Sequence, residues 1–134
     1  MAVVKPFRGL RPPKSIARDL ACLPYDVMNA GEALKMAEGR DCSLLHITRS
    51  EIDLPPDTDV HSDEVYKKSV SNFKLWRNKG WLVQDEEPYF YIYAQTMKGR
   101  TQYGIVGCAS VDDYLNDVIK KHELTRPDKE QDRM

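Results

Sequence analysis

Residues 89–111 read YFYIYAQTMKGRTQYGIVGCASV. The first nine are rich in aromatic and β-branched side chains, which favour strands, and Lys98-Gly99 is a two-residue turn signal. The stretch therefore predicts a β-hairpin in which the chain from Arg100 to Val111 returns antiparallel to residues 89–97.

A row of tyrosines lies on one face of this predicted hairpin. Side chains alternate along a strand, so Tyr89, Tyr91 and Tyr93 share one face. Such a row can stack the bases of a nucleic acid. It can also pack against a helix with its hydroxyl groups at the rim, and the sequence leaves both interpretations open.

The segment before the hairpin carries the clearest helical pattern, from Asp63 to Asn78 (residues 63–78). Ser62 is a favourable N-cap residue, and acidic residues follow it in the first turn, where the helix dipole favours them. The apolar stripe recurs at steps of three or four residues and consists of Tyr66, Val70, Phe73 and Trp76. We expect an α+β fold, with a small mixed or antiparallel sheet whose 89–111 hairpin packs against this main helix.

The N-terminal residues predict little regular structure. Residues 1–13 contain three prolines, so this part of the chain is expected to be extended or rich in turns. A short helix is expected over residues 15–20, and Pro24 prevents its continuation.

Residues 29–61 predict one helix, one strand and one loop. Asn29 and Glu32 form a capping-box pair at the start of a helix that ends near Gly39. Residues 43–48 predict a strand flanked by polar turns. Residues 49–61 contain two prolines and several acidic side chains, which predict a solvated loop.

Length and charge exclude several classes of protein. At 134 residues the chain fits one domain with its own core. Lys and Arg total 20 against 21 for Asp and Glu, and this balance argues against a dedicated nucleic-acid-binding domain. No stretch approaches the ~18 apolar residues needed to span a bilayer, and the N-terminus lacks the features of a signal peptide. The chain is therefore expected in the cytoplasm, without a membrane partner.

The three cysteines, Cys22, Cys42 and Cys108, stand far apart. No Cys-x-x-Cys spacing occurs, so neither a zinc site nor a disulfide framework is indicated, and no metal ligands are predicted. Their flanking residues are partly apolar, so we expect buried free thiols.

The segment from Val118 to Arg133 reads VIKKHELTRPDKEQDR. Thr125 and Asp128 form a capping-box-like pair and Pro127 suits a first helical turn, so a helix is expected to begin near residue 126. Its free N–H groups and the surrounding cations predict a phosphate or carboxylate site. The side chains of this anion site are Lys121, His122, Arg126 and Lys129.

Acidic residues in the same segment give an alternative interpretation. They are Glu123, Asp128, Glu130 and Asp132, and pairing with the cations would make the segment a solvated, mixed-charge surface. The chain ends at Met134, before this helix could gain an apolar face. We therefore expect residues 1–134 to be a single domain, or the N-terminal part of a longer domain that is truncated near 134.

Four segments together resemble one protein family over essentially the whole chain. They are PFRGLRP (6–12), PYDV (24–27), LHITRSEIDLP (45–55) and the run 119–133. These segments are similar to the N-terminal region of the domain of unknown function 1015 family. The resemblance implies a cytoplasmic bacterial or archaeal protein, longer than this chain, whose biochemical role is unassigned.

The resemblance also implies a function for the complete protein. The later part of the family carries an Asp-Gly-His-His-Arg type motif, absent from this chain, that is similar to motifs of ParB-like nucleotide-binding domains and free-serine kinases. This implies binding of a nucleotide or phosphorylated small molecule, and phosphoryl transfer to a small metabolite, with the remainder of the full-length chain contributing to the site. The alternative is a non-catalytic regulatory or interaction module. No cofactor is indicated, and the absence of the G-x-x-x-x-G-K-[ST] pattern excludes a Walker-type NTPase.

Phosphoryl transfer needs cations to offset the charge of the transferring group and a base to orient the acceptor. The candidate bases are His122, Glu123 and Asp26. Arg8 and Arg11 flank Gly9 and are expected to join the anion contacts. Each has a structural alternative: the arginines as surface residues beside prolines, and Asp26 as the cap of a turn.

His46 and Arg49 lie in and just after the predicted strand over residues 43–48. In that position both side chains could reach an active cleft. The alternative for His46 is a structural histidine held by hydrogen bonds.

Overall fold

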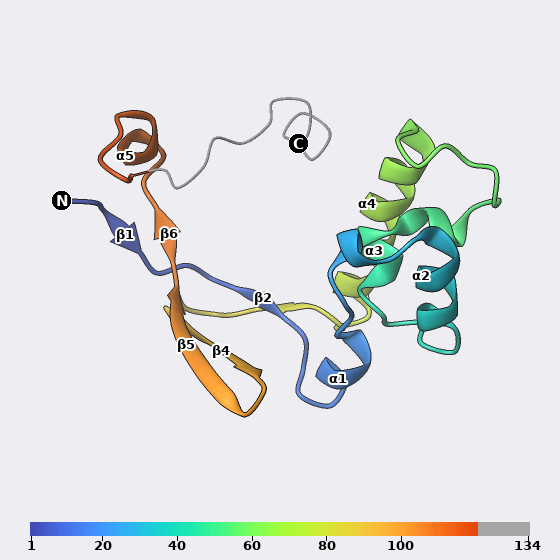
Figure 1. Ribbon diagram of the computed structural model, residues 1–134, viewed down its shortest axis with the longest axis horizontal. Helices are drawn as coiled ribbons and strands as arrows, with labels where there is room; N and C mark the ends of the chain where they lie inside the picture. The colour runs from blue at the N-terminus through green and yellow to red at the C-terminus, as the bar shows by residue number, and fades with distance from the viewer. Residues whose placement is uncertain (121–134) are drawn as a thin grey trace. The chain divides into compact units, whose positions relative to one another are not determined.

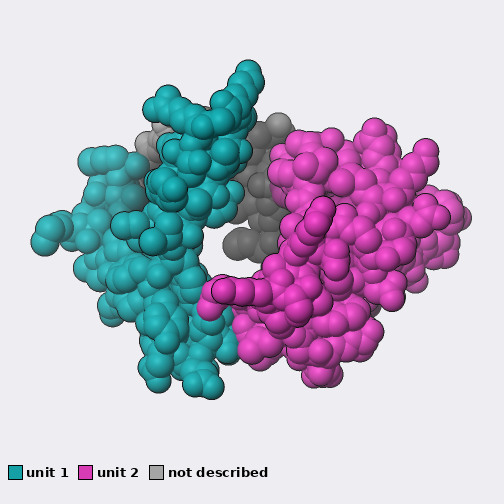
Figure 2. All heavy atoms as spheres, turned by 90° about the horizontal axis from the view of Figure 1, so that it is seen from below, with its two compact units in different colours: residues 1–9, 84–134 teal, residues 10–83 magenta. Residues whose placement is uncertain are grey.

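The computed structural model describes residues 1–120 of the chain (Figure 1). The chain divides into two compact units (Figure 2). Unit 1 consists of residues 1–9 and 84–134, and unit 2 consists of residues 10–83. The described residues contain helices and small antiparallel sheets, and the predicted α+β class is confirmed.

Unit 2 is largely helical, and every buried apolar side chain of the described residues lies in it. Its elements are β2 (Leu10–Arg11), α1 (Ala17–Leu20), η1 (Tyr25–Val27), α2 (Ala30–Ala37), α3 (Leu45–Thr48), η2 (Ser50–Asp53), α4 (Asp63–Asn78) and β3 (Val83–Gln84), of which η1 and η2 are single 3-10 turns. The predicted short helix near residues 15–20 is confirmed as α1. Strands β2 and β3 pair with each other.

Helix α2 begins at the predicted capping box. The Asn29 side chain accepts a hydrogen bond from the Glu32 backbone N–H at 2.9 Å, and the Glu32 carboxylate accepts one from the Asn29 N–H at 2.9 Å. Two N–H groups that the helix itself cannot satisfy are thereby bonded. Gly39 follows the helix with a φ of 68°, the left-handed conformation that glycine adopts without strain.

The strand predicted over residues 43–48 is wrong, because Leu45–Thr48 is the helix α3. Side chains distant in sequence satisfy the carbonyls of this short helix. Asn72 donates to the His46 carbonyl oxygen at 2.6 Å, and Ser69 donates to that of Ile47 at 2.8 Å. Tertiary hydrogen bonds therefore override the strand propensity of the segment.

Helix α4 has the predicted bounds, and its buried face includes part of the predicted stripe, because Trp76 is buried and Phe73 is partly buried. Its buried residues are Val65, Asn72 and Trp76, whereas Tyr66 and Val70 are exposed. Within unit 2 the helix packs against α3 and η2. The side of α4 that faces α3 carries Ser69 and Asn72, whose side chains donate hydrogen bonds to the α3 carbonyls. These bonds explain why polar residues lie on the inner face of the helix.

Two apolar clusters form the core of unit 2. One consists of Met28, Ala33, Ala37 and Leu45, and the other of Leu20, Trp76 and Leu82, with Phe73 partly buried against the second. A guanidinium nitrogen of Arg40 lies 2.7–3.3 Å from the carbonyl oxygens of Arg18, Asp19 and Ala21, at the end of α1. This cation satisfies carbonyls that a helix end leaves without partners.

Unit 1 contains the hairpin that the sequence predicts. Its elements are β1 (Val4–Lys5), β4 (Tyr91–Met97), β5 (Arg100–Val106), β6 (Cys108–Ala109) and α5 (Val111–Leu115). Strands β4 and β5 are antiparallel, with Tyr91 opposite Val106 and Met97 opposite Arg100 (Figure 1). Strand β1 pairs antiparallel with β6.

The three tyrosines of the hairpin differ in their surroundings. Tyr89 and Tyr93 are exposed, whereas Tyr91 is partly buried. The Tyr91 hydroxyl accepts a hydrogen bond from the Gly9 N–H at 2.6 Å and donates to the Asp85 carboxylate at 2.6 Å. A Cβ atom on Gly9 would lie 2.5 Å from this hydroxyl oxygen, so only glycine fits at position 9.

All three cysteines are free thiols, as expected. Cys22 and Cys42 are partly buried, and the expectation of burial is wrong for Cys108, which is exposed on β6. Burial raises the pKa of the Cys22 thiol, and the Arg40 guanidinium lowers it by a smaller amount.

Alkylation with iodoacetamide at pH 8 should therefore modify Cys108 faster than Cys22, because the exposed thiolate is the reacting species. Peptide mass spectrometry of samples quenched over time measures the two rates. The chain unfolded in urea is the control, and there the two rates should converge. A native Cys22 that reacts as fast as Cys108 would contradict the burial of Cys22.

Within residues 1–120, no helix combines the length and the apolar character that crossing a membrane requires.

Candidate functional site

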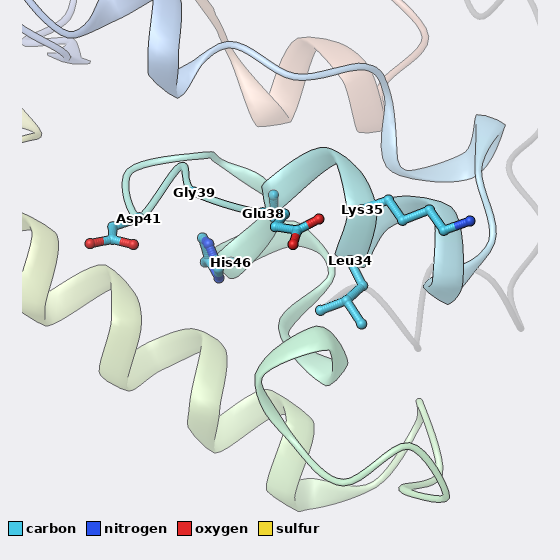
Figure 3. Close-up of a pocket in the computed structure, with 7 residues that line it drawn as sticks. Leu34, Lys35, Glu38, Gly39, Asp41 and His46 are labelled. Carbon is cyan, nitrogen blue, oxygen red and sulfur yellow. The ribbon is translucent and has the colours of Figure 1, made fainter.

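A pocket of about 450 Å³ opens in unit 2 at the C-terminal end of α2 (Figure 3). It is lined by Leu34, Lys35, Ala37, Glu38, Gly39, Asp41 and His46. These residues come from α2, the turn that follows it and α3. The pocket therefore lies between two short helices and the turn that joins them.

Local hydrogen bonds shape the turn beside the pocket. The Arg40 N–H donates to the Ala37 carbonyl at 2.9 Å, and the Ser43 N–H donates to the Arg40 carbonyl at 2.8 Å. With the left-handed backbone of Gly39, these bonds reverse the chain after α2. The reversal brings Asp41 and His46 to the same opening as Glu38.

The Nδ1 atom of the His46 ring is hydrogen-bonded to the carboxylate of Asp53. Nδ1 of His46 lies 2.7 Å from Oδ1 of Asp53, and Nδ2 of Asn72 donates to Oδ2 of Asp53 at 2.7 Å. A carboxylate on Nδ1 fixes the tautomer that leaves Nε2 as the acceptor. This is the arrangement of the histidine–carboxylate pairs that enzymes use for general-base catalysis.

Two buried polar atoms near the pocket have no hydrogen-bond partner among the described residues: Nε2 of His46 and Oγ of Ser43. Ser43 is fully buried and lies one helical turn before His46. Buried polar atoms are nearly always bonded to protein or to ordered water. Both atoms therefore retain hydrogen-bonding capacity for a water molecule or a ligand group.

The charge around the pocket is mixed. Glu38 and Asp41 contribute carboxylates, and Lys35 contributes one ammonium group. The Lys35 side chain extends away from His46, whereas Glu38 and Asp41 appear to either side of the ring in this view (Figure 3). A pocket of this composition favours an amine or hydroxyl group beside His46 over a phosphate.

The structure places three of the sequence-predicted site residues outside the pocket lining. Arg8 donates from Nε to the Asp85 carbonyl oxygen at 2.8 Å, and Arg11 is exposed on β2. Asp26 is exposed in the 3-10 turn η1. These residues stay predictions as anion contacts and as a base.

The remaining predicted residues are Lys121, His122, Glu123, Arg126 and Lys129, and they lie outside the described residues, as does the helix expected near residue 126. Of the two residues considered near the predicted strand, His46 lines the pocket. Arg49 does not line the pocket, and its Nε lies 2.7 Å from the Glu51 carboxylate.

The sequence pattern did not indicate Asp53 or Asn72 as partners of His46. Asp53 lies in a segment that predicts a solvated loop, but Ser50–Asp53 is the 3-10 turn η2. Asn72 interrupts the apolar pattern of α4 on the buried side. A polar residue at a buried helical position was the available signal for this network. Within residues 1–120, no group of three or more His, Cys, Asp and Glu side chains is placed to hold a metal ion.

Comparison with known proteins gives one match. A family model described as "Protein of unknown function (DUF1015)" matches residues 4–134. No curated protein and no solved structure matches the chain.

Proposed function

The chain belongs to the DUF1015 family of proteins of unknown function, and from its pocket we propose that it is the N-terminal part of a phosphoryl-transfer enzyme. This enzyme binds a nucleotide or a phosphorylated metabolite and transfers the phosphoryl group to a small, hydroxyl-bearing metabolite. The observation that carries the proposal is the His46–Asp53 pair at the wall of the pocket.

His46 acts in this proposal as the general base. Phosphoryl transfer requires a group that orients the acceptor hydroxyl and takes its proton. Asp53 holds Nδ1, so Nε2 is the nitrogen that receives the proton. Nε2 is covered from solvent in this structure. The acceptor therefore reaches Nε2 only when a neighbouring part of the pocket wall moves.

Glu38 and Asp41 suggest the chemistry of the acceptor. Their carboxylates attract a cationic or amine group, which places a neighbouring hydroxyl close to His46. A small amino alcohol satisfies both requirements. Arg8, Arg11, Lys121, Arg126 and Lys129 stay proposed as anion contacts of the complete protein, and His122, Glu123 and Asp26 stay proposed as other candidate bases.

A non-catalytic regulatory or interaction module is the second candidate. The observation that favours it is the exposed apolar surface of the hairpin, where Ile92 and Ile105 are 78% and 80% exposed. Large apolar patches rimmed by polar residues are typical of interaction sites.

A thermal-shift screen of the full-length protein distinguishes the two candidates. Nucleotides, phosphorylated metabolites and amino alcohols should raise Tm if the protein is an enzyme, because ligands that bind the folded state stabilise it. Stabilisation by an oligonucleotide alone would instead favour the module.

Changing His46 to glutamine should lower phosphoryl transfer to the best acceptor by about 10²–10⁴-fold, the usual contribution of a general base. The nucleotide-induced change in Tm should persist, because His46 does not contact the donor in this proposal. His61→Gln is the matched control, since His61 is exposed and lies outside the pocket lining. Full activity of His46→Gln would remove His46 from the reaction.

A further inference from the structure

One face of the β4–β5 hairpin carries only apolar and uncharged side chains. Cross-strand partners share a face, so Ile92 and Ile105 lie together, as do Ala94 and Tyr103. Continuing the register places Phe90 beside Gly107, where its ring lies 2.9 Å from the position that a Cβ atom would occupy. We define these five side chains, Phe90, Ile92, Ala94, Tyr103 and Ile105, as the apolar hairpin face.

This face is exposed in the described structure. Ile92, Ile105 and Tyr103 are 78%, 80% and 71% exposed, and Phe90 is 51% exposed. The opposite face also carries apolar side chains, among them Tyr93, Met97 and Val106, but it includes Gln95 opposite Gln102, and Arg100. Within the two strands, the charged and amide side chains thus lie on the opposite face, whereas the apolar hairpin face is uncharged and exposed.

The described part of unit 1 supplies no core that covers this face. Its described part contains no buried apolar side chain, whereas both apolar clusters lie in residues 10–83. A two-stranded hairpin is at best marginally stable in water without a packed face. Both strands are also edges, which present unpaired N–H and C=O groups. A partner that packs on the apolar hairpin face would therefore stabilise the hairpin.

We propose that this partner is a second copy of the chain, packed hairpin face to hairpin face about a twofold axis. The same patch then serves both copies, and the contact closes without forming a filament. The two hairpins would stack as a small sandwich, with the sheets ~10 Å apart.

Area, charge and composition support a second copy. The exposed side chains offer roughly 500–600 Å² per copy, or about 1,000–1,200 Å² for the pair, which reaches the lower limit for a specific interface. The face carries no charged side chain, and the net charge of the chain is −1, so two copies do not repel each other. Residues 121–134 contain only Leu124 and Met134 as large apolar residues, which is too little apolar area to cover the face.

Analytical ultracentrifugation of the full-length protein over a range of concentrations tests the proposal. The chain should form a dimer with a Kd in the micromolar range, and Ile105→Lys should raise that Kd by about 30-fold or more, as expected for a central contact. Gln102→Lys is the matched control, because it adds the same charge to the same strand on the opposite face. It should leave the dimer intact.

Tyr103→Glu provides a second variant on the apolar hairpin face in case Ile105→Lys does not fold, and circular dichroism verifies the fold of each variant. A chain that stays monomeric at the highest soluble concentration would overturn the proposal. So would an equal loss of the dimer with Gln102→Lys and Ile105→Lys, or a dimer that neither Ile105→Lys nor Tyr103→Glu weakens.

Discussion

Replacing Trp76 by alanine is expected to lower the free energy of unfolding by about 3–5 kcal/mol. Trp76 is only 2% exposed and is the largest fully buried side chain of the described residues. It packs with Leu20 and Leu82, and its ring contacts Trp81 edge-to-face at a centroid distance of 5.7 Å. Alanine would leave a cavity that the neighbouring helices and loops can close only in part.

Urea unfolding, followed by tryptophan fluorescence and circular dichroism, measures this change. Leu75→Ala is the matched control, because Leu75 precedes Trp76 on the same helix and is 46% exposed. Its expected cost is below about 1 kcal/mol. Equal losses for the two variants would show that the inner face of α4 is not the one described.

Replacing Asn72 by leucine should lower the free energy of unfolding by about 2–4 kcal/mol, although leucine has a similar volume and higher hydrophobicity. The Asn72 amide donates to the His46 carbonyl oxygen at 2.6 Å and to the Asp53 carboxylate at 2.7 Å. Leucine has no N–H donor in its side chain. The His46 carbonyl oxygen and the Asp53 carboxylate oxygen would therefore each lose one hydrogen bond. An unsatisfied acceptor of this kind costs more than the added apolar contact contributes.

Asn78→Leu provides the matched control, because Asn78 is exposed at the end of the same helix. Thermal unfolding of both variants at neutral pH should show a clear decrease in Tm for Asn72→Leu alone. A stable Asn72→Leu variant would mean that Asp53 and His46 hold their positions without α4. The anchoring of the pocket histidine would then rest on Asp53 alone.

The local signals in the sequence predicted local structure correctly. The capping box of Asn29 and Glu32, the bounds of the helix over residues 63–78 and the turn at Lys98-Gly99 each depend on neighbouring residues, and the structure confirms all three. Each of these features is determined by hydrogen bonds or backbone conformations within a few residues. Such features can be predicted from a single sequence.

The errors arise where distant residues decide the structure. Residues 43–48 carry a strand-like pattern, but donors from Ser69 and Asn72 satisfy the carbonyls of α3 and stabilise a helix. A pattern based on hydrophobicity assigns asparagine and serine to the solvent side, so it did not predict that Ser69 and Asn72 would face α3. One set of tertiary hydrogen bonds thus explains both the wrong strand and the unpredicted contacts of α4.

The candidate site was predicted only in part for the same reason. His46 could be considered from its sequence, but its partner Asp53 lies in a segment with the composition of a loop. The pocket itself depends on the turn between α2 and α3, and it forms only if residues 45–48 are helical. The strand predicted over residues 43–48 therefore could not have led to a prediction of this pocket.

The close contact between Gly9 and Tyr91 links two positions that are 82 residues apart. A side chain at position 9 would overlap not only the hydroxyl oxygen of Tyr91 but also its ring carbon Cζ, at 2.7 Å. Removing the hydroxyl alone therefore does not make room, and only loss of the ring would. In evolutionary terms, positions 9 and 91 should covary across homologous chains. Position 9 should be glycine wherever position 91 is aromatic, and other residues should occur at position 9 only where the ring at position 91 has been lost.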